Sequence, residues 1–470
     1  MTASSTSFKS PRAHAPTTTT TTTTPNTRII SSAQPYRTLV TAFLIWKAVL
    51  FAIALGSSLV GDAYDTSADL LVHGGVEAAT TGQQRAQQPL GLSGGLVSRF
   101  ASWDAIYFLS SAKRGYIYEQ EWAFGAGLPI VVRGILQGAR HVGIAPPADG
   151  GVLPEAVIGV TVANTAHFLS VIVLFHLGQV VWRDRTLSLV AALLHIVSPA
   201  GMFLTAPYME SSYAFLAFTG YLLFALSSQA ESRALTRDVY LVLAGIFFGL
   251  ATAFRSNGIL NGIPFAWEVL RHLPNLPHKP FDTIRRLVAL GIGGICVALG
   301  SIIPQAIAYG QFCSGASGVD PRPWCEAYLP SIFTFVQEHY WNVGFLRYWT
   351  ISNLPLFLLA TPMLAILVRS GVEQPTSARQ PVIAAKPVES AQLTSLVQSA
   401  AAAQVVLAAL AIAMYHVQII TRISSGYPLW YWWVAGSLIR GEKVGGYIVK
   451  FMVLYALIQG VLFTSFLPPA

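Results

Sequence analysis

The sequence predicts an all-helical protein that crosses a membrane many times. Of its 470 residues, 53% are hydrophobic and only 11% are charged, and its mean hydropathy is +0.54. Soluble globular proteins have about 25% charged residues, so this chain has too little polar surface to cover a water-soluble fold. Because a straight span needs roughly 20 apolar residues, the apolar stretches predict a bundle of about nine to eleven transmembrane helices.

The first elements are a tail and a helix. Residues 1–35 contain the run APTTTTTTTTPNT, and a Thr-rich segment with almost nothing to bury is typical of a disordered tail. An apolar stretch follows at about 38–60. Since a polar tail rather than a cleavage site precedes it, we expect a retained helix and not a cleaved signal peptide.

The later apolar stretches lie near 152–181, 186–205, 211–228, 239–253, 258–272, 287–310, 351–369, 397–421, 427–440 and 446–466. Several of them are shorter than a straight span. Short apolar pieces predict broken or paired half-helices, which a bilayer tolerates only where protein or a water-filled cavity covers the backbone.

Basic residues predict the orientation of the spans. With a cytosolic tail, alternating spans place in the cytosol five stretches that all carry Lys or Arg, namely 182–185, 231–238, 271–286, 371–396 and 440–443. This is the positive-inside pattern, and it requires the chain to reverse at FRSNG, residues 254–258. We therefore expect one multi-pass domain, 36–470, with large luminal loops at 61–151 and 311–350 and a flexible cytosolic loop at 371–396.

Charge and cysteine content narrow the possible partners. The formal net charge is +8, but the basic residues are scattered at the ends of apolar segments, so we expect no nucleic-acid partner. Three cysteines are too few for a disulfide scaffold. Cys313 and Cys325 lie in a polar loop and can pair if that loop faces an oxidising lumen, whereas Cys296 lies in an apolar run typical of packing.

The stretch SRFASWDAIYF, residues 98–108, predicts an amphipathic helix along the membrane surface. Ser102 occupies a capping position before Asp104, and aromatic residues recur at helical spacing as Phe100, Trp103 and Tyr107. Two interpretations are open. Asp104 complements the helix dipole while the aromatic residues anchor the interface, or it is a general base at the mouth of a lipid-facing cavity.

Three further charged residues have two interpretations each. Glu119, in KRGYIYEQEW, is either part of a solvated loop or a contact to a sugar or lipid headgroup. Glu210, in TAPYMES, lies at the end of a span, where capping and substrate contact are both open. Arg255 lies within a long apolar stretch, where an arginine costs about 2.5–3.5 kcal/mol. It therefore needs an anionic partner, either a buried carboxylate or a phosphate, the latter with help from Asn257.

The later polar stretches supply a second wall of the expected site. His339 and Arg347 lie among many aromatic residues in 313–349. His416 and Arg422 lie on one sector of a helix end and predict a second polar contact to a phosphate. His339 has no second histidine nearby, and no metal-binding spacing emerges, so we expect no metal.

Five motifs in collinear order resemble the PIG-V family of glycosylphosphatidylinositol (GPI) mannosyltransferases, of the GT-C class. They are SWDAIYFLSSAKRGYIYEQEWAF, SPAGMFLTAPYMES, FRSNGILNG, PWCEAYLPSIFTFVQEHYWNVGFLRYW and HVQIITRISSGYPLWYWW. The resemblance runs from about residue 38 to the end and implies an enzyme of the endoplasmic-reticulum membrane. It implies the addition of the second mannose, in α-1,6 linkage, from dolichol-phosphate mannose to a mannosyl-glucosaminyl-phosphatidylinositol.

The resemblance also implies roles for residues. Asp104 matches the acidic position of the first luminal loop and is the expected general base, whereas Tyr107 stands where other members often have His. Because the donor mannose is β-linked and the product α-linked, one inverting displacement with a single base suffices and no cofactor is expected. We expect the donor phosphate to contact Arg255, Asn257, His416 and Arg422, and the substrates to contact Trp103, Tyr107, Glu119, Glu210, His339 and Arg347.

Other functions are open from the residues alone. They are another dolichol-phosphate-dependent mannosyltransferase, a flippase or transporter of a lipid-linked sugar, and a structural subunit of a membrane complex. No repeat of two halves is visible, which disfavours a transporter, and a structural subunit leaves Arg255 without a reason. The expected partners are the two lipid substrates and the membrane. Whether a small accessory membrane subunit is also a partner is open.

Overall fold

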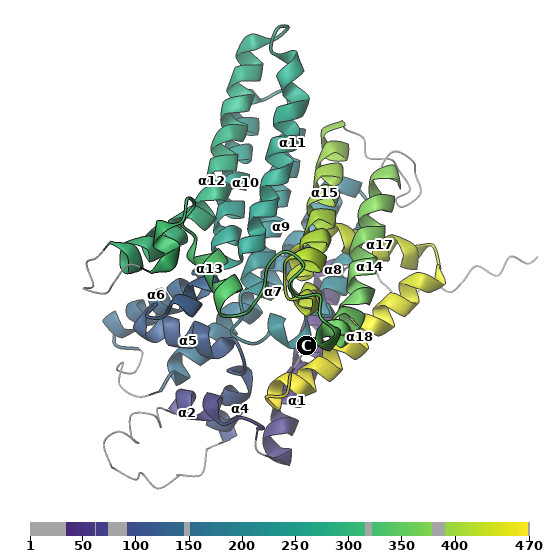
Figure 1. Ribbon diagram of the computed structural model, residues 1–470. Helices are drawn as coiled ribbons and strands as arrows, with labels where there is room; N and C mark the ends of the chain where they lie inside the picture. The colour runs from purple at the N-terminus through teal and green to yellow at the C-terminus, as the bar shows by residue number, and fades with distance from the viewer. Residues whose placement is uncertain are drawn as a thin grey trace, which may run out of the picture.

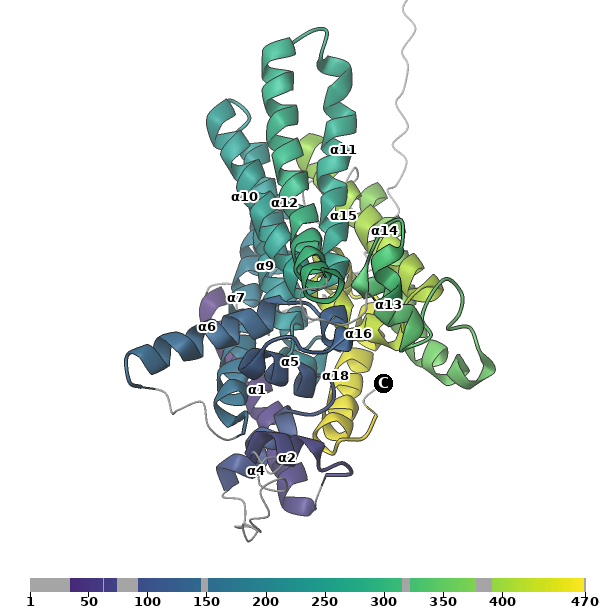
Figure 2. The ribbon, with the colours of Figure 1, turned by 60° about the vertical axis from the view of Figure 1, so that its left-hand side comes forward.

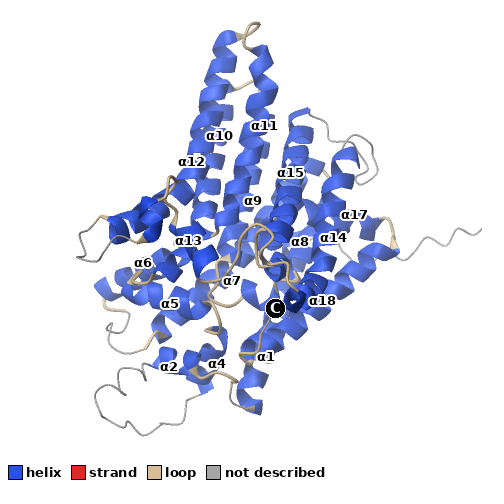
Figure 3. Cartoon of the chain, viewed as in Figure 1, coloured by secondary structure: helices blue, strands red, loops and turns tan. Residues whose placement is uncertain are grey.

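The computed structural model describes residues 34–61, 63–73, 92–144, 151–314, 322–377 and 391–468. Within these ranges the chain forms helices, turns and loops and no β-strand (Figure 3). This confirms the all-helical prediction. The tail expected to be disordered lies outside the described residues as far as residue 33, and so does the middle of the 371–396 segment, residues 378–390.

Eight of the described helices are long and apolar enough to cross a membrane. They are α1 (Pro35–Val60), α7 (Leu153–Trp182), α9 (Glu210–Gln229), α10 (Ala234–Phe254), α12 (Pro280–Cys313), α14 (Leu354–Ser377), α15 (Ala391–Ala413) and α18 (Lys443–Thr464). The shorter helix α8 (Arg185–Ile196) is also apolar, and two further short helices are α11 (Ile263–His272) and α17 (Pro428–Ile439). Each predicted apolar stretch overlaps one of these helices, so the multi-pass architecture is confirmed.

The outward faces of the long helices are apolar. On α12, for example, Ile295, Ile302 and Ile307 have more than half of their surface exposed. Exposed apolar area on this scale needs a cover, which the hydrocarbon of a bilayer provides. Inside the bundle, small residues bring helices together: a Cβ on Gly245 of α10 would lie 2.3 Å from Cα of Gly293 of α12, the close backbone approach common between membrane helices.

The chain reverses where the positive-inside pattern required it. Helix α10 ends at Phe254, and the 3-10 helix η3 (Ser256–Gly262) leads into α11. Arg255 sits at the reversal with an extended backbone, φ −143° and ψ 128°. Figure 1 shows α10, α11 and α12 side by side as a tall group, with the short η4 (Leu273–Asn275) where α11 passes to α12.

The first long polar segment, 61–151, contains several short helices. They are α2 (Ser67–His73), α4 (Leu92–Phe100), α5 (Ala105–Arg114), η1 (Glu119–Ala123) and α6 (Gly127–His141). Figure 2 shows α6 running crosswise to the tall group of α10 and α12. This orientation suits a helix that lies at the surface of a membrane.

The expected amphipathic helix around Asp104 is interrupted. Phe100 ends α4, Trp103 adopts φ 60°, and α5 begins only at Ala105. A positive φ is uncommon outside glycine, and the Trp103 ring stacks on Phe466, with 5.3 Å between ring centroids. The prediction of one helix carrying all three aromatic residues was therefore wrong, because packing against the distant C-terminal segment breaks it.

The remaining short helices flank the later spans. They are η2 (Gly201–Leu204), η5 (Pro323–Glu326), α13 (Ile332–His339), η6 (Ile351–Asn353), η7 (Val417–Ile419), α16 (Ile420–Ile423) and η8 (Ser424–Gly426). The described ends of the 371–396 segment are helical, because α14 continues to Ser377 and α15 begins at Ala391. These ends differ from the flexible loop that the sequence predicts.

Candidate active site

Four charged side chains from four separate segments form a chain of ion pairs, which we call the charge cluster: Asp104, Arg422, Glu210 and Arg255. Nη1 of Arg255 lies 2.6 Å from Oε1 of Glu210. Nη2 of Arg422 lies 3.1 Å from Oδ2 of Asp104, and its Nε lies 3.7 Å from Oε1 of Glu210. The cluster thus alternates negative and positive groups from Asp104 to Arg255.

The four side chains differ in exposure. The side chain of Glu210 is 0% exposed, whereas that of Asp104 is 30% exposed. Arg255 and Arg422 are 16% and 15% exposed. A ligand can therefore reach Asp104 and the edges of both arginines. We expected Glu210 to contact the substrate, but a fully buried carboxylate cannot, and its contacts are with the two arginines.

Burial makes the charges of the cluster depend on one another. Buried charges are costly unless each has an opposite partner, and Glu210 supplies that partner to both arginines. Within the described residues, Oε2 of Glu210 and Nε of Arg422 have no hydrogen-bond partner. Since buried polar atoms are nearly always satisfied, the hydrogen bonding of the cluster is incomplete at these two atoms.

Aromatic rings hold Arg422 in place. Its guanidinium carbon lies 4.7 Å from the ring centre of Phe203 and 5.9 Å from that of Tyr208, within the range of cation–π attraction. The Tyr208 hydroxyl donates to the Ser102 carbonyl at 3.1 Å. This buried tyrosine therefore ties the segment before Asp104 to the segment before Glu210.

Lys47 of α1 forms hydrogen bonds with the turn that precedes Glu210. Its Nζ donates to the Leu204 carbonyl and to Oγ1 of Thr205, both at 2.8 Å. The Leu204 carbonyl also accepts a hydrogen bond from the Ser211 hydroxyl at 3.0 Å. The lysine is buried, and these hydrogen bonds fix the turn that carries Phe203 and leads to Glu210.

Asn257 contacts Tyr427 rather than the charge cluster. Its Nδ2 donates to the Tyr427 oxygen at 3.4 Å, and the Tyr427 hydroxyl donates to the Asn257 carbonyl at 3.3 Å. These contacts join η3 to the start of α17. The structure therefore places Asn257 in the packing of two helix ends, beside but not within the charge cluster.

An aromatic wall extends from the charge cluster toward the second long polar segment, 311–350; it consists of Tyr107, Phe124, Trp341 and His416. Successive ring centroids are 5.5, 5.5 and 6.2 Å apart. Burial, with the charge of Arg422 adding to it, lowers the pKa of His416 below 6.5. The imidazole is thus neutral at neutral pH, so it can offer a phosphate a hydrogen bond but no charge.

Glu119 links the two long polar segments. Its carboxylate accepts hydrogen bonds from Arg322 at 2.6 Å, Trp324 at 2.9 Å and Tyr340 at 3.0 Å. Burial raises the pKa of Glu119, but these hydrogen bonds outweigh it, and the net pKa is lowered from 4.5. The expectation of a substrate contact is not met here, because three neighbours of the protein itself occupy this carboxylate.

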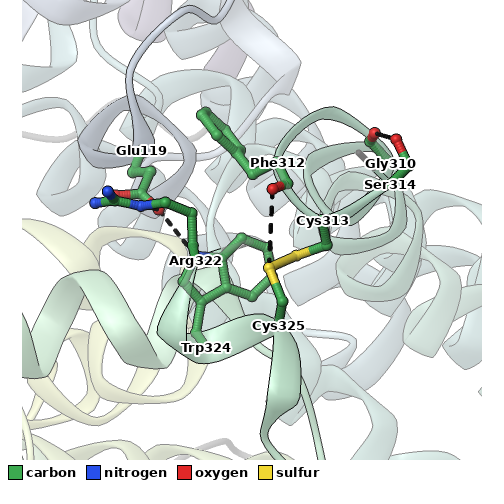
Figure 4. Close-up of a disulfide and its surroundings, with 8 residues drawn as sticks. All are labelled: Glu119, Gly310, Phe312, Cys313, Ser314, Arg322, Trp324 and Cys325. Atoms are coloured by element: carbon green, nitrogen blue, oxygen red, sulfur yellow. Dashed lines mark hydrogen bonds and ion pairs between the residues drawn. A yellow bond between two sulfur atoms is a disulfide. The ribbon is translucent and has the colours of Figure 1, made fainter. Parts of the chain in front are cut away.

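A disulfide joins Cys313, at the end of α12, to Cys325 in η5. Figure 4 shows the bridge beside Trp324 and Arg322, which both reach toward Glu119. The disulfide therefore closes the segment that carries two of the Glu119 partners, Arg322 and Trp324. It anchors the second long polar segment to a membrane helix and, through Glu119, to the first.

The other expected site residues make local contacts. The His339 ring stacks on Phe335, with 4.9 Å between centroids, and Arg347 forms an exposed ion pair with Glu338 at 3.5 Å. Both sets of contacts lie within the second long polar segment, so the structure does not bring these residues into the charge cluster. Trp103 packs on Phe466 and flanks Asp104 as a structural neighbour.

Several supporting residues were not predicted from the sequence. Phe203 and Tyr208 lie in the motif that contains Glu210, but nothing in the pattern shows that their rings face Arg422, which lies 219 and 214 positions later. Arg322 directly precedes the Pro-Trp-Cys of Cys325, and that closeness to the cysteine was the available signal. Among the described residues there is no group of three or more His, Cys, Asp or Glu side chains able to hold a metal.

The chain is a multi-pass helical membrane protein in which a reachable carboxylate and two partly exposed arginines meet. The model of a family described as mannosyltransferase (PIG-V) matches residues 91–470. The chain belongs to the PIG-V mannosyltransferase family, which confirms the resemblance seen in the motifs.

Curated relatives agree in name. A protein of Chaetomium globosum named GPI mannosyltransferase 2 is 60% identical over 95% of this chain and 98% of its own length. Proteins of the same name from Gibberella zeae and Aspergillus oryzae are 42% and 40% identical, covering 93% and 94% of this chain and 98% of each relative. Among solved structures, an oligosaccharyltransferase of Archaeoglobus fulgidus aligns with a TM-score of 0.43 and 12% identity over 93% of this chain and 55% of that one.

Proposed function

We propose that this chain is the mannosyltransferase that adds the second mannose during GPI-anchor biosynthesis, in α-1,6 linkage, with dolichol-phosphate mannose as donor. Membership of the PIG-V family and the shared name of the relatives support the pathway. The observation that carries the chemistry is the charge cluster, in which an accessible carboxylate lies beside two partly accessible arginines.

The two arginines would bind the phosphate of the donor. Arg255 and Arg422 each direct one edge of the guanidinium at Glu210 or Asp104, and each has part of its surface exposed. Guanidinium groups bind phosphate through paired, charge-assisted hydrogen bonds. The neutral His416, at the end of the aromatic wall, would add a hydrogen bond rather than a charge.

Asp104 would act as the general base of a single displacement. It takes the proton of the acceptor hydroxyl as that oxygen attacks the anomeric carbon of the donor mannose. The bond from this carbon to the phosphate oxygen breaks, and dolichyl phosphate leaves as an anion against the arginines. Attack from the opposite face turns the β-linked donor into an α-linked product. The step needs no cofactor, because the base takes the proton and the leaving group carries the charge.

The location follows from the pathway and the lipids. GPI precursors and dolichol-linked donors lie in a bilayer, so the charge cluster must open at a membrane surface. We assign that surface to the luminal side of the endoplasmic reticulum, supported by the positive-inside pattern and by the disulfide, which needs an oxidising compartment.

A transfer assay with purified protein tests the proposal. The protein is incubated in lipid with labelled dolichol-phosphate mannose and a synthetic mannosyl-glucosaminyl-phosphatidylinositol. We expect a product with one added mannose that an α-1,6-specific mannosidase removes. Three results would overturn the proposal: no product from folded protein, transfer only to an unrelated acceptor, or movement of the lipids across the bilayer without a new glycosidic bond.

A further inference from the structure

A groove lies between α6 and the membrane helices α10 and α12, outside the charge cluster. Its volume is about 460 Å³, within the usual range of small-ligand sites. Its walls are almost wholly apolar and include Ile130 of α6, Leu250 and Ala253 of α10, and Ile303 and Ile307 of α12. Because these helices face lipid, a hydrocarbon chain can enter the groove directly from the bilayer.

One cation lines this apolar groove. Arg133 of α6 donates from Nε to the Ala112 carbonyl at 3.0 Å and from Nη2 to the Lys113 carbonyl at 3.2 Å. Both acceptors are neutral, and no carboxylate among the described residues forms an ion pair with this arginine. The charge of Arg133 is therefore uncompensated at the edge of a site made for hydrocarbon.

A residue that lines the groove carries an unsatisfied polar atom. Trp122 lines the groove, is 8% exposed, and its indole Nε1 has no hydrogen-bond partner within the described part of the chain. A donor left unpaired in a buried site is uncommon. Together with Arg133 it fits a ligand that has an apolar tail and an anionic, hydrogen-bond-accepting head.

The reaction involves two lipid phosphates at different distances from the reacting atoms. The donor phosphate carries the bond that breaks, so it must lie in the charge cluster. The acceptor phosphate is separated from the attacking hydroxyl by an inositol and two sugar rings. Helix α5 separates Arg133 from Asp104 by a comparable length. Asp104 precedes its first residue, and Arg133 binds carbonyls at its last turn. Its ten residues measure about 15 Å.

We propose that Arg133 and this groove bind the phosphatidylinositol end of the acceptor lipid. The inference rests on the proposed function, since it takes the acceptor from it. The phosphate lies against Arg133, an acyl chain lies between α6 and α12, and the glycan runs along α5 toward Asp104. Charge complementarity between an unpaired guanidinium and a lipid phosphate carries the assignment.

Kinetics with each lipid varied in turn test the proposal. Arg133→Gln keeps an amide donor for the two carbonyls but removes the charge. We expect it to raise the KM for the acceptor by about fivefold or more, the size expected for one basic side chain at a lipid headgroup. The KM for the donor and the rate at saturating acceptor should not change, and Arg133→Lys should stay close to the parent protein. An unchanged acceptor KM, or an equal rise in the donor KM, would overturn the proposal.

A matched pair of variants tests whether the groove binds the acyl chain. Ile130→Trp fills it, whereas Ile135→Trp places the same bulk on an exposed position of α6 that does not line it. We expect only Ile130→Trp to raise the acceptor KM. Equal effects of the two would contradict the groove as the acyl site.

Photolabelling provides a readout without turnover. The full chain in vesicles is irradiated with phosphatidylinositol bearing a photoactivatable acyl chain, or with a photoactivatable polyprenyl phosphate. We expect the first probe to label the Ile303–Ile307 region, and Arg133→Gln to weaken this labelling. Labelling of that region by the polyprenyl probe alone, or by neither probe, would overturn the proposal. Labelling by phosphatidylinositol in a protein that transfers no mannose would instead show that only the proposed function fails.

Discussion

Nη2 of Arg422 lies 3.1 Å from Oδ2 of Asp104, and 318 positions of sequence separate the two residues. The arginine that faces the accessible carboxylate is also within 3.7 Å of Glu210, which binds Arg255. The proposed base and the proposed phosphate ligands are therefore positioned by one another. Binding of a donor phosphate at the arginines would set the distance between the leaving group and the base, as near-attack geometry requires.

Replacement of Arg255 tests its contact with the donor phosphate. Arg255→Lys keeps the charge beside Glu210 but loses the planar, two-pronged donor. We expect kcat/KM for the donor to fall about ten- to hundredfold, the loss expected for one hydrogen bond to a charged group, while the protein still accumulates in membranes. Transfer at the parent rate by Arg255→Ala would refute the contact.

Glu210 should contribute strongly to stability, because it is the shared counter-ion of two arginines. Its removal in Glu210→Ala leaves two arginines without their shared counter-ion, which costs about 3–5 kcal/mol for a buried pair. A matched control is Glu338→Ala, because its ion pair with Arg347 is about half exposed and such pairs contribute about 0–1 kcal/mol. We expect thermal unfolding in detergent to show a large loss of Tm for the first variant only. Equal small losses would mean that the arginines do not depend on Glu210.

The disulfide should hold the second long polar segment in place. Cys313→Ser or Cys325→Ser opens a bridge across 12 positions, and bridges of this loop size contribute about 3 kcal/mol. We expect faster cleavage of this segment in limited proteolysis. Cys296→Ser changes the free cysteine of α12 and should leave cleavage at the parent rate. Peptide mapping without reduction that finds Cys313 and Cys325 as free thiols would contradict both the bridge and an oxidising compartment.

Acidity should loosen the contact between the two long polar segments through Glu119. The pKa of Glu119 is lower in the folded protein than its usual 4.5, because burial, which raises it, is outweighed by hydrogen bonds from Arg322, Trp324 and Tyr340. This stabilisation is complete above pH 4.5 and is lost as the pH falls through the folded value. We expect tryptophan fluorescence to report a transition below pH 4.5 in the parent protein. Its persistence unchanged in Glu119→Gln would assign the transition to another group.

The spans were predictable because their cause is local. Apolar stretches must form helices in a bilayer, and the alternation of basic loops located the reversal at Arg255 before any contact was known. The sequence also showed that Arg255 needs an anion, yet it left open a carboxylate or a phosphate. The structure supplies a carboxylate, Glu210, 45 positions away, and the exposed edge of the guanidinium leaves room for the phosphate as well.

Contacts between distant segments could not be predicted from the sequence. The helix expected around Asp104 fails because Trp103 packs on Phe466, 363 positions later by number, and no local pattern reports that contact. Glu119 looks like a surface carboxylate until the disulfide-bonded segment brings Arg322 against it. His416 was expected as a polar contact to a phosphate, and no local pattern reports the burial that lowers its pKa.

The proposed role of Asp104 as the general base is tested by the rate of mannosyl transfer by Asp104→Asn. The amide keeps the size of the carboxylate and can still contact Arg422, but it cannot accept the proton. We predict that transfer to the synthetic acceptor falls by about 10²–10⁴-fold, with Tm and the affinity for donor lipid close to those of the parent protein. Transfer near the parent rate by well-folded Asp104→Asn would show that Asp104 is not the general base.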